Sequence, residues 1–301
     1  MSRLQNLYVQ FKIKLLKMRF SLYNKVVKSI EDLEDNDTCV QKLCKTYPEL
    51  SPATLEKYIF TVDSRKVKKS YHKITQCDEV SNYCHQYQKA IENGEPPGVI
   101  LRLAKQLRFS PAMTAKIILE YHLNVLGESK GVFIGASRSK VNKLLRDTTL
   151  ITDRDLSYEV YLCLIQDDTY GPFADSMKHS LGHEYEFLLK NKLEEKKIAF
   201  QDENVLRSRG YDKTPDFKLD IPIAIDGHVV NWIESKASFG DEENHRNYLR
   251  DQFWSYWNRF GPGLVIYWFG FIEELDEHKE KGILIKDHMP DNITFMNPLG
   301  K

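Results

Sequence analysis

Asp216, Glu234 and Lys236 are the residues whose types and spacing could do chemistry. Asp216 follows a proline, and Glu234 and Lys236 come eighteen and twenty residues later, on a stretch that alternates as a β-strand does. Between them, Asp226-Gly227 predicts a two-residue hairpin, because a type I′ turn needs positive φ at both central positions. The predicted hairpin brings Asp216 level with Glu234 and Lys236.

Side chains alternate between the faces of a strand, so Glu234 and Lys236 should share one face and Ser235 the other. Two carboxylates held close together raise each other's pKa unless a cation lies between them. Mg²⁺ or Mn²⁺ suits such an oxygen-rich site, and it could polarise a phosphodiester and lower the pKa of a bound water. Lys236 could position or deprotonate that water, or stabilise the developing negative charge. The pattern indicates metal-assisted phosphodiester hydrolysis; the alternative is a surface hairpin with an ion pair of little energetic weight.

These residues also carry a family resemblance. Pro215-Asp216 followed by Glu234-Ser235-Lys236 resembles the PD-(D/E)XK nuclease signature. The longer strings KHSLGHEYEFLL, GYDKTPDF, WIESKASFGDE and DQFWSYWNRFGPGLVIYW resemble the small TPD-motif family of codanin-interacting nucleases. That resemblance runs from about residue 20 to the end of the chain. It implies Asp216, Glu234 and Ser235 as metal ligands, Lys236 as the catalytic lysine, and a codanin-like protein as a partner.

The resemblance further implies a glutamate on the helix before the first core strand. Glu184 and Glu186 are both candidates. Glu186 is favoured as a catalytic residue and metal ligand, because Leu189 and Leu193 follow it by three and seven residues. The leucine spacing nevertheless leaves Glu184 open.

A Gln-x-x-x-Tyr pattern often follows the lysine in the RecB-like branch of the superfamily. Gln252 and Tyr256 stand at that spacing, one helical turn apart on one face, and the resemblance implies that they belong to the catalytic site. The alternative is a polar edge beside a core stripe of Leu249, Phe253 and Trp257.

The elements that must position these residues follow an α/β order. Residues 174–197 predict a helix and residues 198–200 a short strand, followed by the hairpin and a helix over 244–259. The apolar run LVIYWFGF from Leu264 predicts one strand buried on both faces, and GILIK and NITFM predict two closing strands. We expect a restriction-endonuclease-like α/β domain with a mixed central sheet over residues 169–301, in the order that the nuclease superfamily uses.

Residues 1–168 predict an all-helical N-terminal domain. Two similar phrases, KLCKTYPELSPATLEKYI and RLAKQLRFSPAMTAKIIL, each have a Ser-Pro helix start, with the serine as N-cap and the proline in the first turn. They predict two helix-turn-helix units. Their basic residues could meet phosphates, and the alternative is a solvated face on an ordinary bundle: Arg65, Lys66, Lys68, Lys69, Arg102, Lys105 and Arg108.

Charge and cysteine content limit the function further. Lys plus Arg and Asp plus Glu both number 43, so nucleic acid would have to bind through a local patch. Five cysteines at irregular spacing predict reduced thiols, and hence a nuclear and cytoplasmic protein that is not secreted. Cys77, Cys84 and His85 near His72 match no zinc finger. No apolar run reaches membrane-spanning length.

Two other charged stretches have alternative interpretations. Residues 1–30 are basic, with Arg3, Lys12 and Lys14 among them and no acid, which predicts a solvated or partner-binding first helix rather than a targeting segment. Asp167-Asp168 predicts a loop at the domain boundary, with a metal site as the weaker alternative.

The sequence therefore predicts a divalent-metal-dependent nuclease, with DNA favoured over RNA. The rival hypothesis is a catalytically weak nuclease-fold protein that serves as a binding partner or regulatory subunit of a codanin-like protein. A third hypothesis is a DNA-binding protein that uses the helical half alone.

Overall fold

The structure is a computed structural model, and it describes residues 17–33, 39–129 and 137–296. Its described residues form two compact units, one of those up to 59 and from 181 onward, and the other of those between 60 and 180. These limits differ from the predicted domains 1–168 and 169–301, since the described residues up to 59 pack with the C-terminal part. Arg3, Lys12 and Lys14 of the predicted basic helix lie outside the described residues.

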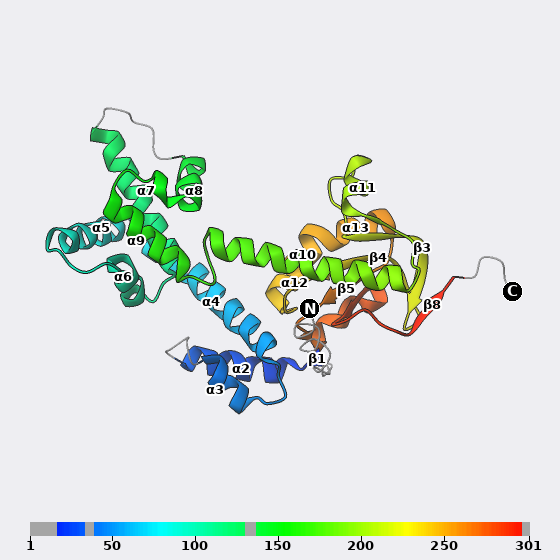
Figure 1. Ribbon diagram of the computed structural model, residues 1–301. Helices are drawn as coiled ribbons and strands as arrows, with labels where there is room; N and C mark the ends of the chain where they lie inside the picture. The colour runs from blue at the N-terminus through cyan, green and yellow to red at the C-terminus, as the bar shows by residue number, and fades with distance from the viewer. Residues whose placement is uncertain (1–16, 34–38, 130–136, 297–301) are drawn as a thin grey trace, which may run out of the picture. The chain divides into compact units, whose positions relative to one another are not determined.

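Figure 1 shows the elements of both units. Two long helices, α4 (Pro52–Ile74) and α10 (Pro172–Glu195), each have residues in both units. The other elements of the first unit are β1 (Lys17–Met18), α2 (Phe20–Asp32), α3 (Cys39–Thr46), β2 (Phe200–Asp202), α11 (Glu203–Ser208), β3 (Phe217–Ile225), β4 (His228–Lys236), α12 (Glu242–Tyr248), the π-helix η2 (Leu249–Phe253), α13 (Trp254–Phe260), β5 (Gly263–Tyr267), β6 (Phe271–Ile272), η3 (Glu273–Lys281), β7 (Ile283–Lys286) and β8 (Ile293–Phe295). Those of the second are α5 (Cys77–Glu92), α6 (Val99–Leu107), α7 (Pro111–Ser129), α8 (Arg138–Arg146), η1 (Thr148–Leu150) and α9 (Arg154–Ile165).

The described part of the first unit contains a six-stranded mixed sheet. Its strand order is β2-β3-β4-β5-β7, with β8 paired to β3. β2, β3 and β4 form an antiparallel meander, and β5 and β7 continue parallel to β4. On one face of the sheet, Leu189 and Leu193 of α10 pack in the apolar core. On the opposite face, the ring of Trp232 on β4 packs against the rings of Phe253 in η2 and Tyr256 in α13. The predicted mixed-sheet α/β architecture is confirmed, and it holds the hairpin between two helical layers.

The N-terminal segment packs on this unit through aromatic side chains and a short strand. Tyr23 and Tyr58 contact the ring of Phe239 just after β4, with ring centres 5.8 and 4.3 Å apart. β1 pairs in parallel with β6, and the Tyr58 hydroxyl donates to Sδ of Met18 at 3.2 Å. These long-range contacts are the reason why the described residues up to 59 join the C-terminal unit.

Three predicted elements differ in their limits. The apolar run from Leu264 is two strands, because Gly270 adopts a φ of 90° and its N–H donates to the Tyr267 carbonyl, which closes a turn between β5 and β6. The helix predicted over 244–259 is interrupted by the π-helix η2. The strand predicted at residues 198–200 begins only at Phe200.

The second unit is a helical bundle around an apolar core, and its caps follow the sequence prediction. Ser110 accepts a hydrogen bond from the Met113 N–H at the start of α7. Its hydroxyl donates to Asp167, whose carboxylate also accepts from the Ala112 and Tyr170 N–H groups. The buried Asp167 therefore links its own loop to the start of α7 by hydrogen bonds, which agrees with the loop predicted at Asp167-Asp168.

Both predicted helix-turn-helix phrases form two helices, namely α3–α4 and α6–α7. The first begins in one compact unit and the second lies in the other, so they are not neighbouring repeats of one domain.

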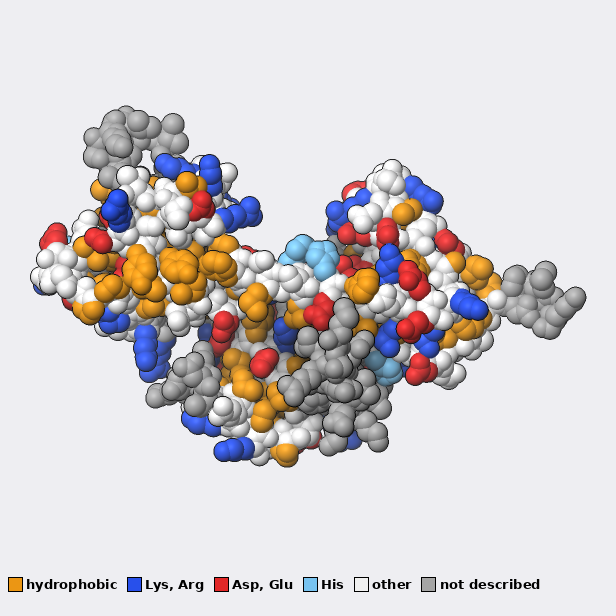
Figure 2. Space-filling model, viewed as in Figure 1, with side chains coloured by type: hydrophobic (Ala, Val, Ile, Leu, Met, Phe, Trp, Pro, Cys, Tyr) orange, Lys and Arg blue, Asp and Glu red, His pale blue; other side chains and the backbone are white. Residues whose placement is uncertain are grey.

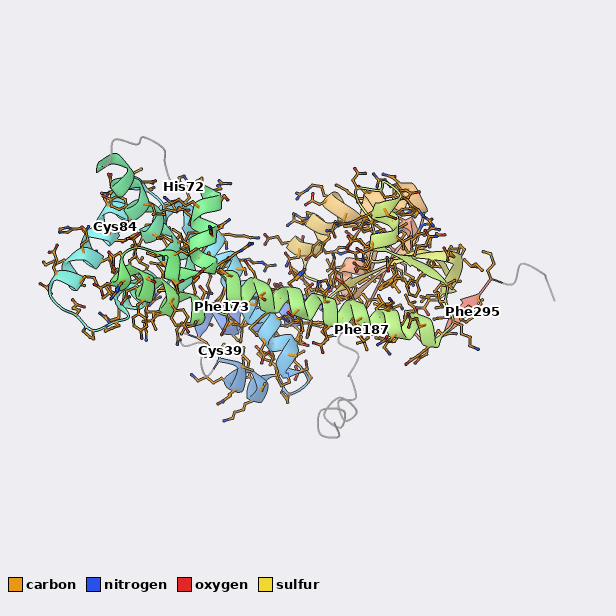
Figure 3. All side chains as sticks on the ribbon, turned by 45° about the horizontal axis from the view of Figure 1, so that its top comes forward. Cys39, His72, Cys84, Phe173, Phe187 and Phe295 are labelled. Atoms are coloured by element: carbon orange, nitrogen blue, oxygen red, sulfur yellow. The ribbon has the colours of Figure 1, made fainter. Side chains whose placement is uncertain are left out.

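The cysteine and histidine side chains considered for zinc do not converge. Cys84 lies in the helical core, where burial raises the pKa of its thiol to about 12, while His72 is exposed on α4 (Figure 3). Cys77 and His85 are exposed as well. No described helix is both long and apolar enough to cross a membrane.

Candidate active site

The β3–β4 hairpin forms as its turn residues predict. Asp226 and Gly227 have φ values of 50° and 79°, so both central positions of the turn are left-handed. Phe217 pairs with Ile233, which places Asp216, just before β3, beside Glu234. The strand register shifts between Lys218 and Ile223, so the turn and this irregularity together join residues eighteen positions apart.

Asp216 and Glu234 are tied to each other through the main chain. The Ser235 N–H donates to Oδ2 of Asp216 at 2.7 Å, and the Asp216 N–H donates to Oε2 of Glu234 at 3.2 Å. The Glu234 side chain is 5% exposed. These two bonds fix both carboxylates at one place on the edge of the hairpin.

Lys236 completes the cluster from the same face of β4. Its Nζ donates to Oε1 of Glu234 at 2.7 Å and to Oε1 of Gln252 at 2.9 Å. The ammonium also lies 4.6 Å from the centre of the Tyr248 ring, a cation–π geometry. Lys236 is therefore held in one position by a carboxylate, an amide and an aromatic ring.

The π-helix separates the two members of the predicted Gln-x-x-x-Tyr pair. Gln252 lies within η2 and reaches Lys236, whereas Tyr256 is buried and meets the ring of Trp232 edge-on, 5.3 Å away. Trp257, predicted to continue the core stripe, is 38% exposed. Tyr256 follows the buried Phe253 by three residues, an ordinary helical spacing, and takes the core position predicted for Trp257.

Burial makes the carboxylate pair electrostatically costly. Burial, followed by repulsion from Glu234, raises the pKa of Asp216 well above its ordinary value. Burial likewise raises the pKa of Glu234, although Lys236 opposes the shift. For Lys236, burial favours the neutral form, but Glu234 and Asp216 outweigh it and the pKa lies above its ordinary value. The site thus holds more negative charge than one ammonium neutralises.

Of the two helix glutamates, Glu186 is the one that the electrostatics associate with the pair. Its charge contributes to the raised pKa of Asp216. It lies 3.2 Å from Nδ1 of His183, on the part of α10 that buries Leu189 and Leu193. Glu184 is exposed. This arrangement supports Glu186 as the third carboxylate near the hairpin.

The donor set fits a hard divalent cation that keeps part of its water shell. No group of three described His, Cys, Asp or Glu side chains is already arranged to hold a metal. Mg²⁺, however, commonly binds through one or two carboxylates, with waters and substrate phosphate completing its shell. Asp216 and Glu234 would hold it, with Glu186 nearby. The Ser235 hydroxyl accepts from Nε1 of Trp268 at 2.8 Å, on the face of β4 opposite Glu234 and Lys236, and its role as a metal ligand stays a prediction.

Two features of the site, the contact of Tyr248 with Lys236 and the π-helix η2, have no clear sequence signal. Tyr248 is four residues before Gln252, a spacing that places both near one helix face, but nothing in the residue itself indicates a contact with Lys236. The π-helix also leaves the apolar period of the surrounding sequence helical, so it cannot be distinguished from an α-helix by pattern.

The fold and the site together define an α/β protein with a mixed sheet and a hairpin that carries two carboxylates and a lysine. Residues 152–289 match the family described as "Protein of unknown function TPD sequence-motif". CDAN1-interacting nuclease 1 from Homo sapiens is 43% identical over 275 residues, which cover 91% of this chain and 96% of the human protein. The proteins of that name from Xenopus tropicalis and Danio rerio are 44% and 42% identical, each over 91% of this chain and over 89% and 90% of their own lengths.

The chain belongs to this CDAN1-interacting nuclease 1 family, which carries the TPD motif. No solved structure matches it.

Proposed function

We propose that the protein is a divalent-metal-dependent nuclease of the PD-(D/E)XK type, hydrolysing phosphodiester bonds in nucleic acid, with DNA favoured over RNA. The observation that carries the proposal is the pair of main-chain hydrogen bonds that hold Asp216 against Glu234, with Lys236 bound to the latter. The relatives are named nucleases, which supports the same reaction class.

Asp216 and Glu234 would hold Mg²⁺ or Mn²⁺, with Glu186 as a further carboxylate. When bound, the ion would polarise the phosphodiester and lower the pKa of a water. The chain's own contribution is a fixed, buried pair of anions whose mutual repulsion a cation relieves.

Lys236 would stabilise negative charge on the phosphate as it develops. An ammonium has three N–H donors, and among the described residues Glu234 and Gln252 take two of them. A phosphate oxygen would accept the third, beside the ring of Tyr248. A charge held at a fixed point in a largely buried site acts more strongly on a transition state than the same charge in water.

A cleavage assay with purified full-length protein tests this function. Labelled single-stranded, duplex and flapped DNA, and the matching RNA strands, are incubated with Mg²⁺, Mn²⁺ or EDTA. We expect products with either ion and none with EDTA. Lys236→Ala should lower the rate by about 10²–10³, as loss of an electrostatic stabiliser does, while Lys218→Ala on β3 keeps it. Cleavage that is unchanged in EDTA or in Lys236→Ala contradicts the proposal.

A second proposed activity is the binding of a codanin-like protein, because the relatives are named for that interaction. It becomes the main function if calorimetry finds no divalent-metal binding while the full chain co-purifies with such a partner. We further propose a nuclear and cytoplasmic location, which imaging of a fluorescent fusion would test.

A further inference from the structure

Helix α8 in the second unit presents an exposed face whose charged residues are all basic. Lys140, Lys143 and Arg146 recur every three residues along its exposed side, opposite the buried Val141 and Leu144. Arg138 adds a fourth exposed cation, and α8 contains no acidic residue. Within the described chain, none of these four basic side chains forms an ion pair.

A hollow with two aromatic walls lies directly after this helix. It has a volume of about 450 Å³, and its lining residues are Thr148, Thr149, Ile151, Arg154, Ser157, Tyr158 and Tyr161. The two tyrosines are one turn apart on α9 and are 51% and 41% exposed. In Figure 2, Lys and Arg side chains gather over α8, beside a band of hydrophobic side chains over α9.

Of the carboxylates nearest in sequence, Asp147 and Asp153 are directed at the main chain, whereas Asp155 is exposed in the first turn of α9. Asp147 accepts from the Thr149 N–H, and Asp153 accepts from the Asp155 and Leu156 N–H groups as the N-cap of α9. These main-chain N–H groups partly offset the negative charge of the Asp147 and Asp153 carboxylates. The basic face of α8 therefore keeps a positive field beside the tyrosines, although the whole chain has no net charge.

We propose that α8 and the α9 hollow form a binding site for single-stranded nucleic acid, with phosphates on Lys140, Lys143 and Arg146 and bases stacked on Tyr158 and Tyr161. Charge complementarity selects a polyanion, and exposed ring faces select bases that are not already stacked in a duplex. Hydroxyl groups of Thr148, Thr149 and Ser157 would contact the backbone. This inference rests on the proposed function, because it names single-stranded nucleic acid as the form of substrate that the nuclease binds.

Fluorescence anisotropy tests the site without cleavage. The full chain carrying Asp216→Asn is titrated, in EDTA, into labelled oligothymidylate of about 16 nucleotides, the upper end of site sizes for single-strand-binding folds. Replacing Lys140, Lys143 and Arg146 with Glu should weaken binding at least tenfold. It should also reduce the salt slope by about 2, since each lost phosphate contact on a single strand accounts for about 0.7. The charge-matched control, with Glu at the exposed Lys42, Lys45 and Lys89, should keep the parent affinity.

The tyrosines provide an independent test if the charge-reversed variant fails to fold. Tyr158→Ala with Tyr161→Ala should weaken binding about tenfold, as loss of stacking does, whereas the double Phe variant keeps it. Equal losses in both charge variants, an unaffected Ala variant, or a surface that takes up a codanin-like protein and no oligonucleotide each overturn the inference. If the Asp216→Asn protein binds the oligonucleotide but the wild-type protein never cleaves it, only the proposed function is contradicted.

Discussion

The amide oxygen of Gln252 accepts a hydrogen bond from Nζ of Lys236 at 2.9 Å, and this contact joins the π-helix to the hairpin. Because Gln252 would act by positioning Lys236, its loss should affect turnover more than substrate binding. We predict that Gln252→Ala lowers kcat about 10–100-fold with little change in KM, the size of effect typical of groups that orient a catalytic ligand. Steady-state cleavage kinetics measure it, with the exposed Gln166→Ala as control. A rise in KM alone would assign Gln252 to substrate binding.

Asp216 should lower the stability of the metal-free protein. Its folded-state pKa is raised, so its contribution to stability is complete below the unfolded value of about 3.9 and is lost as pH rises through the folded value. In EDTA at neutral pH, Asp216→Asn should therefore raise the melting temperature, by roughly 2–4 °C for each kcal/mol regained. The difference from wild type should shrink toward pH 4. Thermal melts across this range measure it, and a destabilised Asn variant would show that the carboxylate is not strained.

The two helix glutamates should differ in their effect on metal use. We predict that Glu186→Gln raises the Mn²⁺ concentration needed for half-maximal cleavage by about tenfold, because the charge of Glu186 acts on Asp216. Glu184→Gln, two residues away on the exposed side, is the matched control and should leave the metal dependence unchanged. The opposite result would move the third carboxylate to Glu184.

Turn chemistry and strand alternation are local signals that predict the hairpin, but they do not predict the register shift between Lys218 and Ile223 that accompanies the meeting of Asp216 with Glu234. The π-helix could not be predicted, because it differs from an α-helix by its hydrogen bonding and not by its residue types. The docking of Tyr23 and Tyr58 on Phe239 depends on contacts across some two hundred residues, which no local pattern reports.

A buried histidine near the site should control acid stability. His245 contacts the Tyr267 hydroxyl at 2.9 Å, and burial together with His278 lowers its pKa to about 4. Because the unfolded chain binds this proton more readily, stability present above pH 6.5 should be lost as pH falls toward 4, by up to about 3 kcal/mol at 1.36 kcal/mol per pH unit. Urea titrations should show this slope in wild type and in the exposed His85→Asn control. A slope that persists in His245→Asn would place its origin elsewhere.

Binding of Mn²⁺ to the full-length protein, measured by calorimetry, tests most directly whether the hairpin carboxylates form a metal site. We predict saturable binding in wild type and in Asp220→Asn, which removes an exposed carboxylate of the same strand. In Asp216→Asn the affinity should fall at least tenfold. Equal affinity in Asp216→Asn and Asp220→Asn, or no binding in wild type, would contradict the account.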